Sequence, residues 1–187
     1  MITYNLANIL TLSRLLMSIV FFVLIAFESR VAVPVLLVAG FTDILDGWVA
    51  RRYHQQTDFG RIADPAMDKV LICCGFILLV GISDGIVLPW MAAVVVGREL
   101  VVQALRSLAE SRGVEFAATL WGKSKMAVQF ATMTYVISIV LWGWSRKPEV
   151  LRDIALIAIW VTVVVTIMSG LVYIFQANKL VGKRRRA

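Results

Sequence analysis

Long apolar stretches separated by short polar segments run through almost the whole chain. Each stretch is close to the ~20 mainly apolar residues that a helix needs to cross a bilayer core about 30 Å thick. The pattern predicts about six transmembrane helices, and these lie at Ile9–Phe27, Val31–Ala50, Met67–Ile82, Ile86–Leu105, Lys125–Trp144 and Ile154–Phe175. We therefore expect an all-α, polytopic membrane protein in which residues 1–187 form a single integral membrane domain.

The composition excludes a soluble globular protein, since 60% of the residues are hydrophobic, 17% are charged and the mean hydropathy is +0.83. Basic residues indicate the orientation, because cytoplasmic loops of membrane proteins are rich in Lys and Arg. One side of the predicted topology holds only a small part of the 19 basic residues, namely Arg30, Arg146, Lys147 and Arg152. We expect the other side, with both termini and the loop between the second and third helices, to face the cytoplasm.

The C-terminal sequence Lys183–Arg186 is entirely basic. Such a tail binds anionic membrane lipids, with each basic residue contributing about 1 kcal/mol near the surface. The alternative is a topology determinant without a ligand. Cys73 and Cys74 are adjacent in an apolar helix and are expected to act as small buried side chains. We expect no nucleic acid partner.

Four aspartates lie where apolar stretches meet, a place where charge is costly unless it has a function. Asp43 and Asp46 are three residues apart near the cytoplasmic end of the second helix, and Asp64 and Asp68 are four apart at the start of the third. Each spacing puts its pair on one helix face. Pro65 fits the first turn of a helix, where a missing N–H costs nothing. Two carboxylate pairs can therefore converge from adjacent helices.

Clustered carboxylates repel one another and take up protons unless a cation lies among them. Arg51 and Lys69 supply part of that charge, but an all-oxygen set suits a hard divalent ion such as Mg²⁺, Mn²⁺ or Ca²⁺. An ion-pair network that joins the helix ends is the alternative. Gly47 and Ala50 allow a ligand or another helix to approach closely, and Gly60 also fits a simple turn.

In chain order, the aspartates and small residues read D-x2-D-G-x2-A-R-x8-G-x3-D-x3-D, formed by Asp43, Asp46, Gly47, Ala50, Arg51, Gly60, Asp64 and Asp68. This pattern resembles the signature of the CDP-alcohol phosphatidyltransferases, with every position filled. Three further segments resemble the bacterial phosphatidylglycerophosphate synthases of that family: NILTLSR at 8–14, GRELVVQALR at 97–106 and WGKSK at 121–125. The resemblance covers nearly the full length.

The resemblance implies six transmembrane helices around a polar cavity open to the cytoplasm, usually in a homodimer, in the bacterial inner membrane. It also implies a reaction in which the hydroxyl of sn-glycerol 3-phosphate attacks the diacylglycerol-bearing phosphorus of CDP-diacylglycerol and releases CMP. Phosphoryl transfer requires mainly positioning and neutralisation of charge, which Mg²⁺ or Mn²⁺ ions, two of them in the expected arrangement, would supply.

The expected residue roles follow the signature. Asp43, Asp46 and Asp64 are the first-choice metal ligands, and Asp68 is the expected general base and a further metal ligand. The residues expected to bind CDP-diacylglycerol are Gly47, Ala50, Arg51, Gly60, Asn8, Thr11 and Arg14. A simple helix cap also explains Asn8 and Thr11.

A phosphorylated acceptor needs fixed positive charge, and the candidates are Arg98, Arg106, Lys123 and Lys125. An arginine inside an apolar span costs about 2.5–3.5 kcal/mol, which favours a cavity-lining role for Arg98. Glu99 is adjacent to it and is expected on a different helical face. Arg106 lies about two turns further along, so the two arginines can flank one pocket. Lys123 and Lys125 also fit ordinary positive-inside markers.

Two alternatives to this function remain open from the sequence. One keeps the donor and changes the acceptor, as in a cardiolipin synthase or a phosphatidylinositol phosphate synthase. The other is a divalent cation transporter, but the aspartates cluster at one membrane edge and the outer halves of the helices offer no ionisable relay.

Overall fold

The computed structural model describes residues 6–53, 58–111, 120–143 and 149–184. Within these ranges, side chains are described at 13, 15–42, 69–109, 111, 122, 124–143 and 149–176. The described residues are helical apart from short turns, and none of them belongs to a strand. The predicted all-α class is confirmed for this part of the chain.

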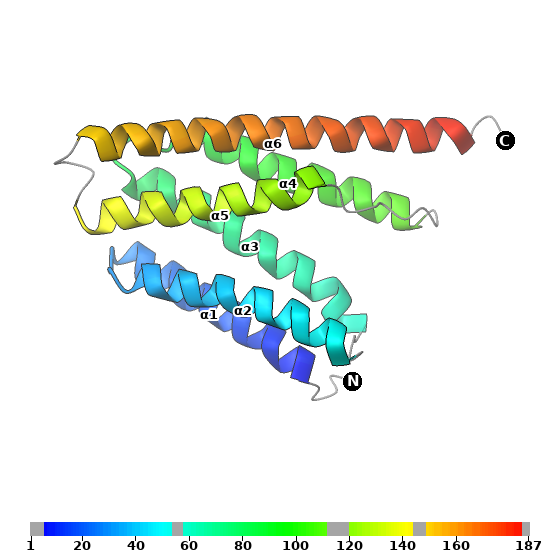
Figure 1. Cartoon of the computed structure of the whole chain (residues 1–187), viewed down its shortest axis with the longest axis horizontal. Coiled ribbons are helices and arrows are strands. Elements are labelled where there is room, and N and C mark those ends of the chain that lie inside the picture. Colours follow the sequence, from blue (N-terminus) through cyan, green and yellow to red (C-terminus); the bar gives the residue numbers. More distant parts are fainter. Residues whose placement is uncertain (1–5, 54–57, 112–119, 144–148, 185–187) are drawn as a thin grey trace.

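Six helices follow one another in the described residues, as the apolar pattern predicts (Figure 1). Their bounds are α1 Leu6–Ala26, α2 Ala32–Tyr53, α3 Asp58–Ile82, α4 Pro89–Ser111, α5 Leu120–Leu141 and α6 Glu149–Arg184. Two stretches are long and apolar enough to cross a membrane: Ser124–Leu141 in α5 and Glu149–Gln176 in α6. Shorter apolar stretches lie in α1, α2 and α3.

The third helix begins earlier than its apolar stretch predicts. It starts at Asp58 and not near Met67, so the expectation that Pro65 occupies the first turn is wrong. Pro65 lies inside the helix, where it cannot donate to the carbonyl four residues earlier, at Arg61. Hydropathy misses this start because the first turns of α3 are polar, and a helix continues beyond the segment that is apolar enough for lipid.

The helices pack in two connected groups. α1 packs against both α2 and α3, while α6 packs against α4 and α5. α3 also contacts α4 and α5, and α2 contacts α5, so the groups share one apolar core that includes Phe21, Phe76 and Met133. A glycine permits the α2–α5 contact, because a Cβ at position 40 would overlap the Phe130 ring.

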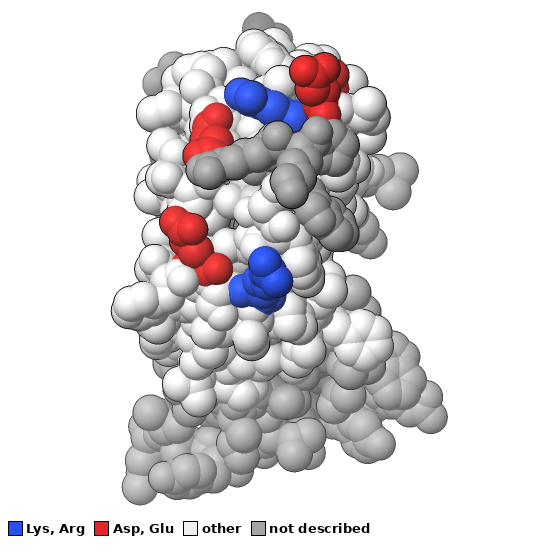
Figure 2. Space-filling model, turned by 90° about the vertical axis from the view of Figure 1, so that its left-hand side faces the viewer, with Lys and Arg blue, Asp and Glu red and all other residues white. Residues whose placement is uncertain are grey.

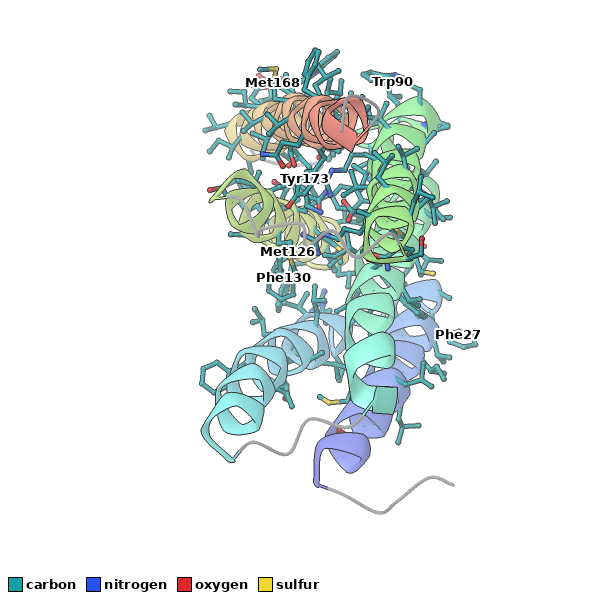
Figure 3. All side chains as sticks on the ribbon, turned by 90° about the vertical axis from the view of Figure 1, so that its right-hand side faces the viewer. Phe27, Trp90, Met126, Phe130, Met168 and Tyr173 are labelled. Atoms are coloured by element: carbon teal, nitrogen blue, oxygen red, sulfur yellow. The ribbon has the colours of Figure 1, made fainter. Side chains whose placement is uncertain are left out.

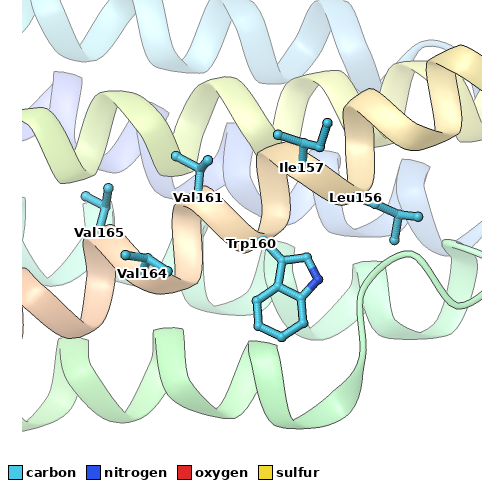
Figure 4. Close-up of a pocket in the computed structure, with 6 residues that line it drawn as sticks. All are labelled: Leu156, Ile157, Trp160, Val161, Val164 and Val165. Carbon is cyan, nitrogen blue, oxygen red and sulfur yellow. The ribbon is translucent and has the colours of Figure 1, made fainter.

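Apolar side chains also cover much of the outer surface, as expected where lipid replaces water. Leu16, Ile157 and Phe175 are each more than 60% exposed. A shallow hollow on α6 is lined only by Leu156, Ile157, Trp160, Val161, Val164 and Val165 (Figure 4). No polar group lines this hollow, so it offers nothing for the chemistry of a phosphate ester.

The two ends of the helical assembly differ in character. At one end, Arg30 in the turn before α2 donates from Nε to the carbonyl of Leu141 at 3.2 Å, which satisfies an oxygen at the C-terminus of α5. Figure 2 shows charged side chains of both signs on this face. The other end brings together the start of α1, the end of α2 and the start of α3 (Figure 1).

Candidate functional site

The aspartate signature lies on two helices joined by a short connection. Asp43 and Asp46 belong to α2 and Asp64 and Asp68 to α3, and only residues 54–57 separate the two helices. Followed back from Tyr53, Asp46 and Asp43 lie seven and ten residues into α2, about 10 and 15 Å. Asp64 and Asp68 lie six and ten residues into α3 from its start, about 9 and 15 Å. Measured along each helix from the end that adjoins the connection, the two pairs therefore lie at similar distances.

α1 packs against both of these helices, and its first turns lie at the same end of the molecule (Figure 1). Several predicted site residues belong to this region, but their side chains lie outside those that the structure describes. They are Asn8, Thr11, Arg14, Asp43, Asp46, Gly47, Ala50, Arg51, Gly60, Asp64 and Asp68, with Lys123 on α5. For these residues the structure gives the helix and the position along it.

The predicted acceptor residue Arg98 is described in full and lies in the interior of α4. Its side chain is 9% exposed. Nη2 donates to Ser169 Oγ of α6 at 2.6 Å, and Nη1 donates to the Glu99 carboxylate oxygens at 3.1 and 3.3 Å. Its Nε–H is buried with no hydrogen-bond partner among the described residues. Both terminal nitrogens of Arg98 are therefore held by hydrogen bonds, and its Nε–H is left to donate to a ligand.

The sequence places Glu99 on a different face of α4 from Arg98, but the long arginine side chain bends back to the neighbouring carboxylate. Glu99 is also paired with Lys125 Nζ of α5, and both side chains are about 95% buried. Lys125 is therefore not an exposed marker of topology. Its charge is directed to a carboxylate in the interior, and it joins α5 to α4.

Glu99 thus serves two buried cations, and this gives a stability prediction. Glu99→Gln is expected to lower the free energy of unfolding by about 3–5 kcal/mol, because it removes the carboxylate that lies between the charges of Arg98 and Lys125. Lys125→Met should cost less, since Glu99 keeps Arg98. SDS titration in mixed micelles measures both. Glu149→Gln, at an exposed position, is the control and should change stability by no more than about 0.5 kcal/mol. Equal losses for Glu99→Gln and Glu149→Gln would contradict this account.

Arg106 lies two turns after Arg98 on α4, and both arginines contact Tyr173 of α6. Its Nη2 donates to the Tyr173 hydroxyl at 3.0 Å. The guanidinium carbons of Arg98 and Arg106 lie 5.4 and 5.5 Å from the centroid of the Tyr173 ring. Figure 3 shows Tyr173 on the inner side of α6, between α4 and α5. Both arginines therefore face one tyrosine ring, and that they flank a substrate pocket stays a prediction.

A polar contact ties this arginine cluster to the aspartate helix. Lys69 Nζ of α3 donates to Gln103 Oε1 of α4. Lys69 directly follows Asp68, and Gln103 lies between Arg98 and Arg106 along α4. The helical turn that carries Asp68 therefore lies beside the segment that carries the arginines.

The sequence of the chain matches the family described as CDP-alcohol phosphatidyltransferase over residues 4–168. The chain belongs to this family. It is a phosphatidyltransferase, which agrees with the function class expected from the signature. The family is generally dependent on divalent metal ions and associated with membranes. Asp43, Asp46, Asp64 and Asp68 carry carboxylates, and carboxylate oxygens are ligands that such ions prefer.

Curated relatives share almost the whole length of the chain. A CDP-diacylglycerol–glycerol-3-phosphate 3-phosphatidyltransferase of Haemophilus influenzae is 30% identical, and the alignment covers 94% of both chains. Proteins of the same name from Salmonella typhimurium and Escherichia coli K12 are each 31% identical over 94% of this chain and 96% of their own. The predicted relationship is confirmed.

Three residues of the site were missed by the sequence reasoning: Gln103, Ser169 and Tyr173. A signal for the last two existed, because Ser169 and Tyr173 are polar, lie four residues apart in an apolar span, and so share a helix face. Both follow the last residue of the family match. Their importance depends on contacts with α4, about seventy positions earlier in the chain.

Proposed function

We propose that the chain transfers the phosphatidyl group of CDP-diacylglycerol to sn-glycerol 3-phosphate, giving phosphatidylglycerol phosphate and CMP. The observation that carries this proposal is the pair of arginines on α4, each with a buried Nε–H that lacks a partner among the described residues, beside the helix that bears Asp64 and Asp68. A guanidinium group is well matched to phosphate oxygens. The names of the relatives from three bacteria support the same acceptor.

The proposal assigns the donor end of the reaction to the signature residues. Asp43, Asp46, Asp64 and Asp68 would hold Mg²⁺ or Mn²⁺, and such ions would neutralise the pyrophosphate charge. Arg51 would bind phosphate oxygens. Gly47 and Ala50 would let the nucleotide lie against α2, with Gly60, Asn8, Thr11 and Arg14 completing the donor site on α1 and α3.

The chemical step needs a base and a phosphate anchor. Asp68 takes the proton from the acceptor hydroxyl as the oxygen of that hydroxyl forms a bond with phosphorus, and the bond from phosphorus to the CMP oxygen breaks. Arg98 and Arg106 hold the acceptor phosphate and so direct its hydroxyl toward the donor. Lys123 is a further proposed contact of the acceptor. Lys125 acts through Glu99, with which it is paired.

The same proposal includes the membrane arrangement. All six helices would span the bacterial inner membrane as one domain, with the site and both termini on the cytoplasmic side and CDP-diacylglycerol entering from the inner leaflet. A homodimer is the proposed assembly. The basic C-terminal tail would contact anionic lipids.

Arginine substitution tests the acceptor site. Arg98→Ala and Arg106→Ala are each expected to raise the KM for sn-glycerol 3-phosphate by about 10–100-fold, because a charge-assisted hydrogen bond to phosphate is lost. The KM for CDP-diacylglycerol should change by less than about threefold. Steady-state assays with purified protein measure both constants. Arg152→Ala, exposed at the opposite end, is the matched control. Equal effects on the two substrates would count against the pocket.

An acceptor panel tests the reaction itself. Purified protein with radiolabelled CDP-diacylglycerol and a divalent metal is expected to release CMP with sn-glycerol 3-phosphate and much more slowly with phosphatidylglycerol or inositol phosphate. A preference for phosphatidylglycerol would indicate a cardiolipin synthase. A preference for inositol phosphate would indicate a phosphatidylinositol phosphate synthase. Metal uptake into liposomes without CMP release would indicate a cation transporter.

A further inference from the structure

Three neighbouring residues of α6, Ser169, Gly170 and Tyr173, lie against the two arginines of α4. We infer that they are positioning residues, which fix Arg98 and Arg106 so that the pocket selects an acceptor carrying a phosphate monoester dianion. This inference rests on the proposed function. It adds residues that determine acceptor specificity and that belong to α6, a helix without signature residues.

The first support is the hydrogen bonding. Ser169 and Tyr173 are one helical turn apart and share a face of α6. Each supplies one oxygen to one arginine: Ser169 Oγ accepts from Arg98 at 2.6 Å and the Tyr173 hydroxyl accepts from Arg106 at 3.0 Å. Among the described residues, the Tyr173 hydroxyl is the only hydrogen-bond partner of the Arg106 guanidinium. The direction of the Arg106 fork therefore depends on this hydroxyl.

The second support is the Tyr173 ring. It is 2% exposed, and both guanidinium carbons lie within 5.5 Å of its centroid. A cation at this distance is attracted to the face of an aromatic ring, and the attraction increases where water is excluded. One ring thus holds two like charges close together that would otherwise repel each other.

The third support is charge and unmet hydrogen bonding. The formal charges of Arg98, Arg106, Lys125 and Glu99 sum to +2, which matches the charge of a phosphate monoester dianion. The two Nε–H groups are buried and have no partner among the described residues. Buried donors are normally satisfied, so a pair left open on adjacent arginines is suited to an anion with several acceptor oxygens.

Gly170 supplies the clearance that Arg98 needs. A Cβ at position 170 would lie 3.2 Å from Arg98 Cγ, which is closer than ordinary van der Waals contact. A side chain here would displace the arginine stem. Gly170 therefore helps Ser169 and Tyr173 to fix the position of the arginines.

The test compares two tyrosines that each lose only a hydroxyl. Tyr173→Phe keeps the ring and removes the acceptor of Arg106, and it is expected to raise the KM for sn-glycerol 3-phosphate about 5–10-fold. The KM for CDP-diacylglycerol, kcat and the melting temperature should change little. Tyr135→Phe is the control, since the Tyr135 hydroxyl donates to the Leu151 carbonyl at 3.2 Å in a region without these arginines. It should leave both KM values unchanged.

A second pair of variants repeats the test without touching a hydrogen bond. Gly170→Ala is expected to raise the acceptor KM about 2–5-fold. Gly81→Ala is its control, because a Cβ at position 81 meets no atom within 4 Å. No change in acceptor KM in Tyr173→Phe, or an equal rise for donor and acceptor with a lower melting temperature, would overturn the inference.

The inference and the proposed function can fail separately. If the wild-type protein uses sn-glycerol 3-phosphate but Tyr173→Phe behaves as Tyr135→Phe does, only the inference is wrong. If the wild type prefers another acceptor, the proposed function is wrong, and Tyr173→Phe is then assayed with that acceptor. A raised KM for a phosphorylated acceptor would support the positioning role, and an unphosphorylated acceptor would overturn the inferred selectivity.

Discussion

Asp68→Asn is expected to lower kcat by about 10²–10⁴-fold, the usual contribution of general base catalysis. The substitution keeps the size of the side chain and removes its ability to accept the proton of the acceptor hydroxyl. Binding of CDP-diacylglycerol should be retained in part, because the three other aspartates of the signature remain. Single-turnover release of CMP measures the chemical step, and equilibrium binding of a labelled donor measures the second quantity.

Asp153→Asn provides the matched control for Asp68→Asn. Asp153 is an exposed residue in the first turns of α6, at the opposite end of the molecule, and its substitution should leave kcat unchanged. An Asp68→Asn enzyme that turns over at half the normal rate would remove Asp68 from the role of base. The other aspartates of α2 and α3 would then be the next candidates.

Removal of divalent metal is expected to stop the reaction, with activity falling by more than about 10³-fold after dialysis against EDTA. Neutralisation of pyrophosphate charge is the main requirement of this type of transfer, and carboxylates alone would repel the donor. Readdition of Mg²⁺ or Mn²⁺ should restore turnover. The metal concentration needed for half-maximal activity should rise in Asp43→Asn, Asp46→Asn and Asp64→Asn.

A readout independent of turnover makes the metal prediction sharper. Isothermal titration of the EDTA-treated protein with Mn²⁺ should show binding that is lost in an Asp43→Asn, Asp64→Asn double variant. Glu149→Gln, exposed at the far end, serves again as the control and should bind Mn²⁺ as the wild type does. Full activity in EDTA would show that the aspartates are not a metal site in this chain.

The apolar pattern predicted the order and number of the described helices, because lipid-facing segments must be both apolar and long. It failed at helix ends. α3 starts at Asp58 and α6 runs to Arg184, both beyond the predicted limits, since a helix continues into water as long as its backbone bonds are made. The hydropathy of the sequence identifies segments apolar enough to contact lipid, but it does not identify the residue at which a helix begins or ends.

Only the part of the candidate site that depends on the fixed spacing of the signature residues could be predicted from the sequence. The spacing of the signature positions placed Asp43 and Asp46 on α2 and Asp64 and Asp68 on α3. The position of the second pair along α3 was predicted wrongly, because α3 begins at Asp58 and these aspartates lie six and ten residues inside it. The surroundings of Arg98 did not follow, because Ser169 comes from a helix far along the chain. The pairing of Arg98 with Glu99 was missed for another reason: helical periodicity describes directions at Cβ, and an arginine has enough rotatable bonds to turn back on its neighbour.

Gly40 lies one helical turn before Asp43, at the place where α2 touches α5. The missing side chain there sets how far the metal-binding aspartates proposed on α2 can stand from α5, whose Lys125 forms an ion pair with Glu99 next to the arginines of α4. The close approach of Gly40 to the Phe130 ring therefore helps to set how α2, with its proposed metal ligands, packs against α5. In the proposed reaction, this contact between two helices would contribute to the alignment of the lipid phosphorus with the acceptor hydroxyl.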